Sequence, residues 1–423
     1  EKSQKLAQAL EATGKVDLLN ISGGHGGNSN SYIIAPMYVP PGSISIPLAS
    51  GIKQVVKSIP VVACSRINDP TIADRVIADD HCDLVGMVRG LIADPEFGNK
   101  AREGMAEDIR LCIGCNQGCS INGRPDCTQN YVAGRETTEI AKIKQAPRKK
   151  KVMVVGGGPA GMEAARVAAQ RGHEVTLYEK DSHLGGRINI LSRAPGREEF
   201  NQVIRYLTIQ LPKSGVRLRL NTEVTLERVM QEKPDAVIIA TGSRDYTEPV
   251  PGSETSRVVN PSQILRGEVE PGKKVIVYEN SGHAEGPTVA DFLGEKGVQV
   301  GLLTSQMNIG MRWGMNIGIL ATQNPFIWQR LRKNGVKITQ LAKIKQISGR
   351  TVTIIDVWSG DERIIDDVDT VVMATGYLPD NDLYKKLRDK ANGLNELYII
   401  GDSAAPRRSL EAIHDGYLTA FYI

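Results

Sequence analysis

Four cysteines within sixteen residues are the side chains with the clearest chemistry. They read Cys112-x-x-Cys115-x-x-x-Cys119, and Cys127 follows after seven more residues. Four thiolates suit either a tetrahedral zinc ion or a [4Fe–4S] cluster. Zinc sites usually present two separated Cys-x-x-Cys pairs, whereas three of these cysteines share one short loop. The spacing therefore favours a cluster, with zinc as the alternative.

The placement of all the cysteines points to a redox environment. All six lie between Cys64 and Cys127. A disulfide framework spreads its bridges through a small secreted domain, so clustering in 423 residues instead indicates a metal or redox centre in a reducing compartment. We therefore expect a cytoplasmic protein.

A glycine motif supplies the second site. Gly156-x-Gly158-x-x-Gly161 follows the strand predicted at 152–155 and opens a helix predicted over 162–170. In such a motif the first glycine makes a tight turn, the second lets the backbone approach a pyrophosphate, and the third lets helix pack on strand. Glu179 can then accept hydrogen bonds from a ribose. The predicted dinucleotide contacts here are Gly156, Gly158, Pro159, Ala160, Gly161, Glu179 and Lys180.

Later motifs favour FAD as this dinucleotide. The chain continues with Gly185-Gly186-Arg187 and two Ala-Thr-Gly turns, at 240–242 and 374–376, and ends with Gly401-Asp402 after an apolar strand at 397–400. This order resembles the two-domain FAD-binding reductases. The resemblance adds cofactor contacts at Gly186, Arg187, Thr241, Gly242, Gly401 and Asp402.

A second unit departs from the glycine pattern. After a strand predicted at 275–278, the sequence reads Glu279-Asn-Ser-Gly-His-Ala-Glu-Gly286. Two carboxylates there bring negative charge toward the place of the phosphates. Binding of NAD(P)H and loss of the nucleotide stay equally open, and we expect His283 to be a turn residue.

The surrounding elements indicate an α/β chain. Short apolar runs alternate with helical stretches, which predicts parallel sheets. We expect the C-terminal part of a (β/α)8 barrel, a cysteine-rich iron–sulfur segment, and two Rossmann-like nucleotide-binding subdomains, one interrupting the other. The predicted boundaries are 1–105 for the barrel part, 106–135 for the iron–sulfur segment, 136–150 for a basic linker, 151–263 with 364–423 for the FAD domain, and 264–363 for the NAD(P)-like domain.

Composition excludes several classes of function. Lys and Arg number 52 against 48 Asp and Glu, a balance that argues against nucleic acid as a partner. No apolar run approaches the roughly 18 to 20 residues that span a bilayer. The chain opens on helix-forming residues without an initiator Met, so we expect it to be the C-terminal part of a longer protein.

Three stretches resemble one family. They are IPVVA…RINDP at 59–70, DLV…RGLIADP at 83–95, and CIGCNQGC at 112–119. Together they are similar to the iron–sulfur branch of the old yellow enzyme family, which includes 2,4-dienoyl-CoA reductase and trimethylamine dehydrogenase. The resemblance implies an FMN-bearing barrel, a [4Fe–4S] cluster on Cys112, Cys115, Cys119 and Cys127, and a module for FAD and NAD(P)H.

The resemblance also suggests where FMN would be held. In such barrels the loops after the last two strands bind phosphate, and here they carry Ser65-Arg66 and Val88-Arg89. His25 lies on the loop after the first strand and is a weak candidate for catalysis. The sequence names no other catalytic acid.

Two directions of electron flow remain open. In the first, NAD(P)H reduces FAD, and the cluster passes the electrons to FMN, which reduces an activated C=C bond of a small molecule. In the second, FMN oxidises an amine, and the cluster passes the electrons to an external acceptor. A third option is an electron-transfer subunit whose catalytic half is a separate chain. Self-association into a homo-oligomer is also left open.

Overall fold

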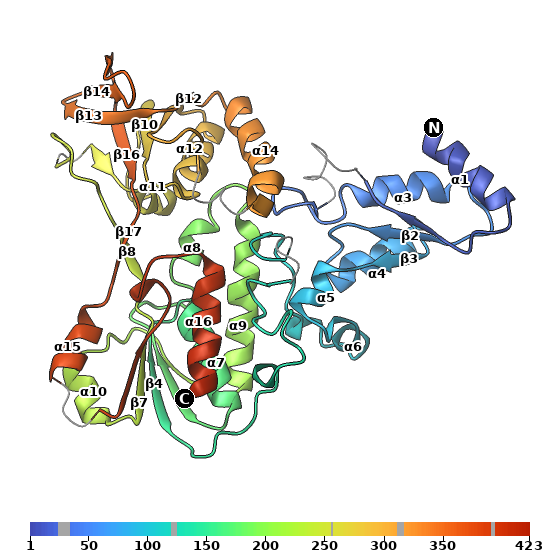
Figure 1. The fold of residues 1–423 in the computed structure, drawn as a ribbon, viewed down its shortest axis with the longest axis horizontal. Coiled ribbons are helices and arrows are strands. Elements are labelled where there is room, and N and C mark those ends of the chain that lie inside the picture. The colour runs from blue at the N-terminus through green and yellow to red at the C-terminus, as the bar shows by residue number, and fades with distance from the viewer. Residues whose placement is uncertain (24–33, 120–124, 255–256, 311–316, 391–393) are drawn as a thin grey trace.

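The protein divides into an arm and two lobes in the computed structural model, which describes residues 1–23, 34–119, 125–254, 257–310, 317–390 and 394–423 (Figure 1). His25 lies outside these ranges. The N-terminus is at the far end of the arm, and the C-terminus is in the lower lobe. Within the described ranges, no helix combines the length and apolar character needed to cross a membrane.

The arm is a small open sheet with helices. Its elements are α1 (Lys2–Ala12), β1 (Leu19–Ile21), α3 (Ser45–Lys53), β2 (Val61–Cys64), α4 (Pro70–Ala78), β3 (Leu84–Gly86), α5 (Arg89–Ala93) and α6 (Phe97–Arg102). The strands pair in parallel in the order β1-β2-β3. Asp69 starts α4 by accepting a hydrogen bond from the Thr71 amide, 2.8 Å away, and Pro70 takes the first helical position. This parallel pairing agrees with the alternation of apolar and helical stretches in the sequence, and the closed barrel stays an expectation.

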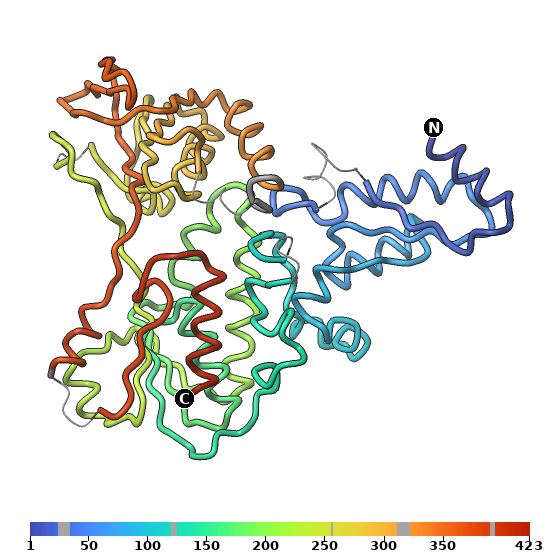
Figure 2. The backbone as a smooth tube through the Cα atoms, viewed as in Figure 1, coloured from blue at the N-terminus to red at the C-terminus, as the bar shows by residue number. Residues whose placement is uncertain are grey.

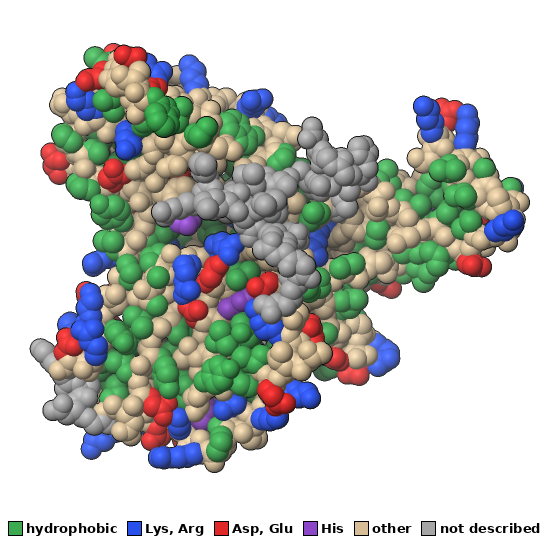
Figure 3. Space-filling view, viewed as in Figure 1, with side chains coloured by type: hydrophobic (Ala, Val, Ile, Leu, Met, Phe, Trp, Pro, Cys, Tyr) green, Lys and Arg blue, Asp and Glu red, His purple; other side chains and the backbone are tan. Residues whose placement is uncertain are grey.

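The surface of the arm is partly apolar. Hydrophobic side chains gather on its face in Figure 3. Leu84 and Leu91 are 48% and 44% exposed, and Val88 is 74% exposed. The core of the arm is correspondingly small, and it includes buried Val61, Ala63 and Cys82.

The lower lobe is a five-stranded parallel sheet covered on both faces. Its elements are β4 (Lys151–Val155), α7 (Pro159–Gln170), β5 (Glu174–Tyr178), α8 (Ile188–Leu191), α9 (Asn201–Lys213), β6 (Arg217–Arg219), α10 (Leu226–Glu232), β7 (Ala236–Ile239), α15 (Asp382–Lys390), β18 (Glu396–Ile399) and α16 (Ser409–Tyr422). The strand order is β18-β7-β4-β5-β6. α7, α9 and α16 pack on one face, and α10 and α15 lie toward the other. Because both faces are covered, β4 and β7 read as continuous apolar runs.

The upper lobe repeats this plan with a different cover. Its elements are β9 (Val258–Val259), α11 (Pro261–Arg266), β10 (Lys274–Glu279), α12 (Glu285–Glu295), β11 (Gln299–Thr304), α14 (Ile317–Lys333), β12 (Lys337–Thr339), β13 (Ala342–Ser348), β14 (Thr351–Asp356), β15 (Glu362–Ile365) and β16 (Thr370–Ala374). The parallel order is β12-β11-β10-β16-β9. Helices cover one face and the antiparallel β13-β14-β15 sheet covers the other.

The sheet pairing corrects the predicted boundaries at 263/264 and 363/364. β9 and β16 belong to the upper sheet, because β16 pairs with both β10 and β9. The chain passes between the lobes through two short strands, β8 (Ser243–Asp245) and β17 (Tyr377–Pro379), which pair antiparallel. Each follows one of the two Ala-Thr-Gly turns. The predicted interruption is therefore present, but it begins just after β8 and ends just before β17.

The cysteine segment joins the arm to the lower lobe. Figure 2 shows it in teal, running between the arm and α9. Arg110 donates to the Tyr206 hydroxyl at 2.9 Å, and Arg205 of α9 donates to the Ile109 carbonyl at 2.7 Å. The single-turn 3₁₀ helices along the chain are η1 (Ala106–Asp108), η2 (Glu139–Ala141), η3 (Glu198–Phe200) and η4 (Gly401–Ser403).

Candidate functional site

Most of the predicted dinucleotide contacts line one large cavity. It has a volume of about 1260 Å³ and opens at the carboxyl ends of the lower sheet. Of the predicted residues, its lining includes Gly156, Gly158, Pro159, Ala160, Glu179, Lys180, Gly186, Arg187, Thr241, Gly242 and Asp402. This volume exceeds the roughly 300–1,000 Å³ of a drug-sized pocket, so there is room for a dinucleotide. Tertiary structure thus brings together motifs that are spread from residue 156 to residue 402.

The glycine turn has the geometry that its spacing predicts. Gly156 has φ +109°, and a Cβ there would lie 2.3 Å from the Ala240 carbonyl oxygen. A Cβ on Gly161 would lie 2.0 Å from the carbonyl oxygen of Gly156. Gly158 has open space where its Cβ would be. The first and third glycines are therefore required by packing, and Gly158 leaves room for a ligand.

Glu179 holds the turn and faces the cavity. Its Oε2 accepts a hydrogen bond from the Gly157 amide at 2.6 Å, and its Oε1 accepts one from the Asp181 amide at 2.9 Å. Gly161 and Gly401 stand behind the lining, where a Cβ on Gly401 would lie 2.9 Å from the Ala160 Cβ. Small residues at these positions let the chain segments approach the turn.

Arg187 forms a cation–π stack inside the cavity. Its guanidinium lies 3.7 Å from the centre of the Tyr377 ring and pairs with Asp245 at 3.0 Å. Burial opposes the charge of Arg187, but the tyrosine and the carboxylate outweigh burial and raise its pKa. Burial raises the pKa of Asp402, whose carboxylate accepts hydrogen bonds from the Ser243 hydroxyl and the Arg407 amide, both at 3.1 Å.

Sequence reasoning missed a basic segment at this site. Arg407, Arg408 and Ser409 also line the cavity, where Ser409 begins α16. The sequence does contain a signal for this segment, because two arginines stand just before the start of a helix, a few residues after the Gly401-Asp402 pair. Basic side chains beside a helix N-terminus suit phosphate groups.

The corresponding turn of the upper lobe contains a buried glutamate. Glu279 ends β10, is fully buried, and accepts a hydrogen bond from the Gly282 amide at 2.5 Å. Burial raises the pKa of this carboxyl group. Glu285 is the first residue of α12 and lines the large cavity, and its Oε2 has no hydrogen-bond partner among the described residues. Two carboxylates therefore stand at this turn, one buried and the other on the lining of the cavity.

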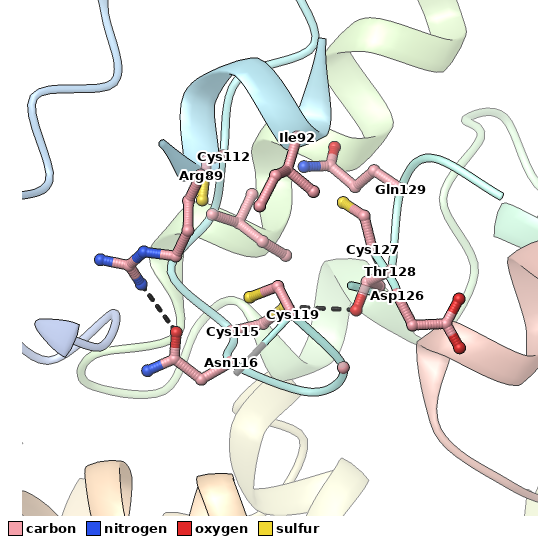
Figure 4. Close-up of a pocket in the computed structure, with 12 residues that line it drawn as sticks. Arg89, Ile92, Cys112, Cys115, Asn116, Cys119, Asp126, Cys127, Thr128 and Gln129 are labelled. Atoms are coloured by element: carbon pink, nitrogen blue, oxygen red, sulfur yellow. Dashed lines mark hydrogen bonds between the residues drawn. The ribbon is translucent and has the colours of Figure 1, made fainter. Parts of the chain in front are cut away.

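The four predicted metal ligands surround one small pocket. Cys112, Cys115, Cys119 and Cys127 all line it, with Arg89 beside them (Figure 4). A Cβ on Gly118 would lie 2.3 Å from the Asp126 carbonyl oxygen, so this glycine lets the two cysteine-bearing segments approach. The Thr128 hydroxyl lies 3.2 Å from the sulfur of Cys115.

The chemistry of this pocket suits a thiolate-bound metal centre. All four cysteines are free thiols. Burial raises the pKa of Cys115 and Cys119, and that of Cys127 to about 12, so metal binding has to displace protons from these thiols. Among the described residues, no three His, Cys, Asp or Glu side chains converge as tightly as one bound ion requires. A [4Fe–4S] cluster would be held by the four cysteines that line the pocket.

The predicted FMN contacts lie where the arm meets the cysteine loop. Arg66 is buried and donates to the carbonyls of Pro36 and Val39 and to Glu199. Burial lowers its pKa to about 10. Arg89 donates to Asn116 at 2.7 Å and to the Ala35 carbonyl at 3.0 Å. Both guanidiniums thus have protein partners.

The FMN role remains a prediction for all four residues. Ser65 has φ +92° and its carbonyl accepts a hydrogen bond from the Ser45 hydroxyl, while Val88 is exposed. A role for His25 likewise stays a prediction, because this residue lies outside the described ranges.

Known proteins resemble this chain along its whole length. It is 36% identical over 436 residues to an NADH oxidase of Thermoanaerobacter brockii, covering 100% of this chain and 64% of the oxidase. The structure of 2-naphthoyl-CoA reductase is 33% identical with a TM-score of 0.91, covering 99% of this chain and 62% of that one. Histamine dehydrogenase from Rhizobium sp. 4-9 is 27% identical with a TM-score of 0.88, covering 99% and 63%. The chain therefore spans less than two thirds of these relatives.

A family assignment rests on the two lobes. Residues 150–399 match the pyridine nucleotide-disulphide oxidoreductase family. This range is more than half of the chain and holds the glycine turn, Glu179 and the interrupting upper lobe. The cavity described above lies at the nucleotide-binding end of that fold. The chain belongs to the pyridine nucleotide-disulphide oxidoreductase family.

Proposed function

We propose that this chain is the electron-transfer part of an iron–sulfur flavoprotein oxidoreductase. One observation carries the proposal: residues of the same loop line both the pocket of four cysteines and the dinucleotide cavity. Cys115 lines the pocket, and Gln117, two residues later, lines the cavity. A metal centre and a flavin held at these two places would be close neighbours.

Each proposed cofactor has residues suited to it. Gly156, Gly158 and the start of α7 would take the pyrophosphate of FAD, with Glu179 on the adenosine ribose. The four cysteines would ligate a [4Fe–4S] cluster, and the arm would contribute to an FMN site. Flavins exchange electrons singly or in pairs, while the cluster carries them one at a time. The protein's part is to hold these groups in order and to exclude water.

In the direction that we favour, electrons flow from the nicotinamide nucleotide to the substrate. NAD(P)H would supply electrons, and the substrate would be a small molecule with an activated C=C bond, of enoate or dienoyl type. Two relatives support this direction, because one is named an NADH oxidase and the other a reductase of 2-naphthoyl-CoA. The intact FAD turn and the Arg187 site are consistent with it.

Two carboxylates of the upper lobe favour a second direction, in which electrons flow from the substrate to an external acceptor. Glu279 is buried at the end of β10, and Glu285 adds a second negative charge at the start of α12. Both oppose an incoming pyrophosphate. In this alternative an amine would be oxidised and an external acceptor would receive the electrons, a direction that agrees with the name histamine dehydrogenase of one relative.

Metal analysis tests the iron–sulfur cluster, which both directions of electron flow require. We expect stoichiometric iron and acid-labile sulfide in the purified protein, and loss of both in Cys119→Ser. Cys64→Ser is the matched control, because Cys64 lies in β2 away from the pocket and contacts the Ile21 carbonyl. Stoichiometric zinc without sulfide contradicts the proposal.

An anaerobic titration separates the two directions. If the first direction is correct, NADH or NADPH bleaches the flavin absorbance. If the second is correct, neither nucleotide bleaches it, whereas a methylated amine does. A protein that retains iron and sulfide but binds no flavin would contradict both.

A further inference from the structure

The cysteine pocket and the dinucleotide cavity are linked by a chain of three polar side chains. The Thr128 hydroxyl lies 3.2 Å from the Cys115 sulfur and 3.5 Å from Gln117 Oε1. The Ser409 hydroxyl lies 3.5 Å from the same Gln117 oxygen. Gln117 and Ser409 both line the cavity, while Thr128 lines the pocket. Figure 4 shows the contact between Thr128 and Cys115.

Burial makes this contact with sulfur significant. Thr128 is 1% exposed, and Cys115 and Gln117 are each 9% exposed. Away from water, the Thr128 hydroxyl has to find its hydrogen-bond partners within the protein. Among the described residues, the oxygen of Gln117 and the sulfur of Cys115 lie within hydrogen-bond distance of this hydroxyl.

The state of the sulfur decides which partner receives the hydroxyl proton. A hydroxyl has one proton to donate. When Cys115 is a thiol, its own proton can point to the Thr128 oxygen, and the hydroxyl can donate to Gln117. When Cys115 is a metal-bound thiolate it has no proton, so a hydrogen bond between the two requires Thr128 to donate to sulfur.

We propose that Thr128 is a positioning residue that raises the reduction potential of the metal centre at Cys115, and that Gln117 competes for the same hydroxyl proton from the cavity side. The inference rests on the proposed cluster. Reduction adds negative charge to a cluster, and a donor aimed at a ligand sulfur stabilises that charge. Since Gln117 lines the cavity, a group bound there can shift the hydroxyl between its two acceptors.

The test compares midpoint potentials of the purified protein by redox titration with dithionite, followed by electron paramagnetic resonance. Thr128→Val keeps the shape and removes the hydroxyl. At the wild-type midpoint potential, we expect its ratio of oxidised to reduced cluster to rise about fivefold, the effect of one net hydrogen bond. Thr128→Ser keeps the hydroxyl and should restore the wild-type midpoint. Thr138→Val is the control, because the Thr138 hydroxyl bonds the Arg135 carbonyl outside the pocket.

A second variant covers the case in which Thr128→Val loses its iron. Gln117→Leu removes the competing acceptor, so the hydroxyl stays on sulfur and the midpoint should rise. An unchanged midpoint in Thr128→Val with full iron, or in Gln117→Leu if the first variant is unstable, overturns this inference alone. A wild-type protein without iron and sulfide overturns the proposed function together with it.

Discussion

The two lobes use the same strand–turn–helix unit in different ways. In the lower lobe four residues separate Gly156 from Gly161, whereas in the upper lobe six residues separate Glu279 from Gly286. Gly161 packs on the backbone of Gly156, and Gly286 packs on the side chain of Glu279. The glycine that lets the helix approach the strand is thus kept in both units.

The two units differ in the residues that hold the turn, whereas the packing of helix on strand is alike. Glu179 at the end of β5 holds the Gly157 amide, whereas Glu279 at the end of β10 holds the Gly282 amide. In the upper lobe the carboxylate has moved to the first strand, and the end of β11 carries Thr304 instead. A Rossmann-like unit can therefore keep its packing while the residues at its turn change, which is why fold does not establish cofactor binding.

The largest expected effect is that of Gly161→Ala. Its Cβ would lie 2.0 Å from a backbone oxygen, so we expect the free energy of unfolding to fall by about 3 kcal/mol, with loss of bound FAD. Gly286→Ala should cost less, because its nearest neighbours belong to the Glu279 side chain. Urea denaturation followed by circular dichroism measures both. Gly215→Ala is the control: its φ of +82° is unfavourable, but a Cβ there meets no atom within 4 Å in the part of the chain that the structure describes. Equal costs for the two glycines would refute this ranking.

Gly158→Ala should separate ligand binding from stability. No atom of the described residues lies within 4 Å of a Cβ at this position, and its φ of −72° suits alanine. We expect an unchanged melting temperature and an affinity for FAD about tenfold weaker, because a methyl group blocks the approach of the pyrophosphate. Calorimetric titration of the flavin-free protein with FAD, and with ADP, checks this. Undiminished affinity would show that the phosphates bind elsewhere.

Glu279→Gln probes the buried carboxyl of the upper lobe. Since burial raises the folded-state pKa above 4.5, the carboxyl's contribution to stability is present below pH 4.5 and is lost as pH rises through the folded-state pKa. Glutamine keeps an oxygen to accept from Gly282 but does not ionise. We expect the variant to melt at a higher temperature than wild type at pH 7, and the gap to close toward pH 4. A gap that is constant with pH would count against a buried ionisable Glu279.

Glu285→Gln should have the smallest effect. It removes one negative charge from the first turn of α12 without removing the side chain. A charge at a helix end is worth about 0.3–1 kcal/mol, so the affinity of the protein for NADH should rise about two- to fivefold. Fluorescence titration at low and high salt measures this, with Glu295→Gln at the other end of α12 as the control. No gain at low salt would mean that the charge at this turn does not limit binding.

Local sequence patterns predicted the elements that carry the two turns. Continuous apolar runs predicted β4 and β10, because strands buried on both faces need side chains that avoid water everywhere. The spacing of Gly156, Gly158 and Gly161 predicted the turn, since its demands are met within a few residues. Two Rossmann-like units were expected, and each lobe contains one five-stranded parallel sheet.

Long-range pairing was outside the reach of the sequence. Nothing local distinguishes β16 as a neighbour of β10 rather than of β7, so the predicted boundary at 364 was wrong. The phosphate role of Arg66 remains a prediction, and only the tertiary structure shows that its guanidinium contacts Glu199, which lies 133 positions away.

For this protein, the sequence by itself determined which functional groups are present: four clustered thiols, one intact glycine turn and one altered turn. The tertiary structure decided which of these groups are neighbours. It brings Gln117 against Ser409 across 292 positions, and it gathers residues from 156 to 409 around one cavity. The physical reason is that hydrogen bonding and glycine geometry act over a few residues, whereas the packing of α16 against α7 and the cysteine segment depends on the whole core.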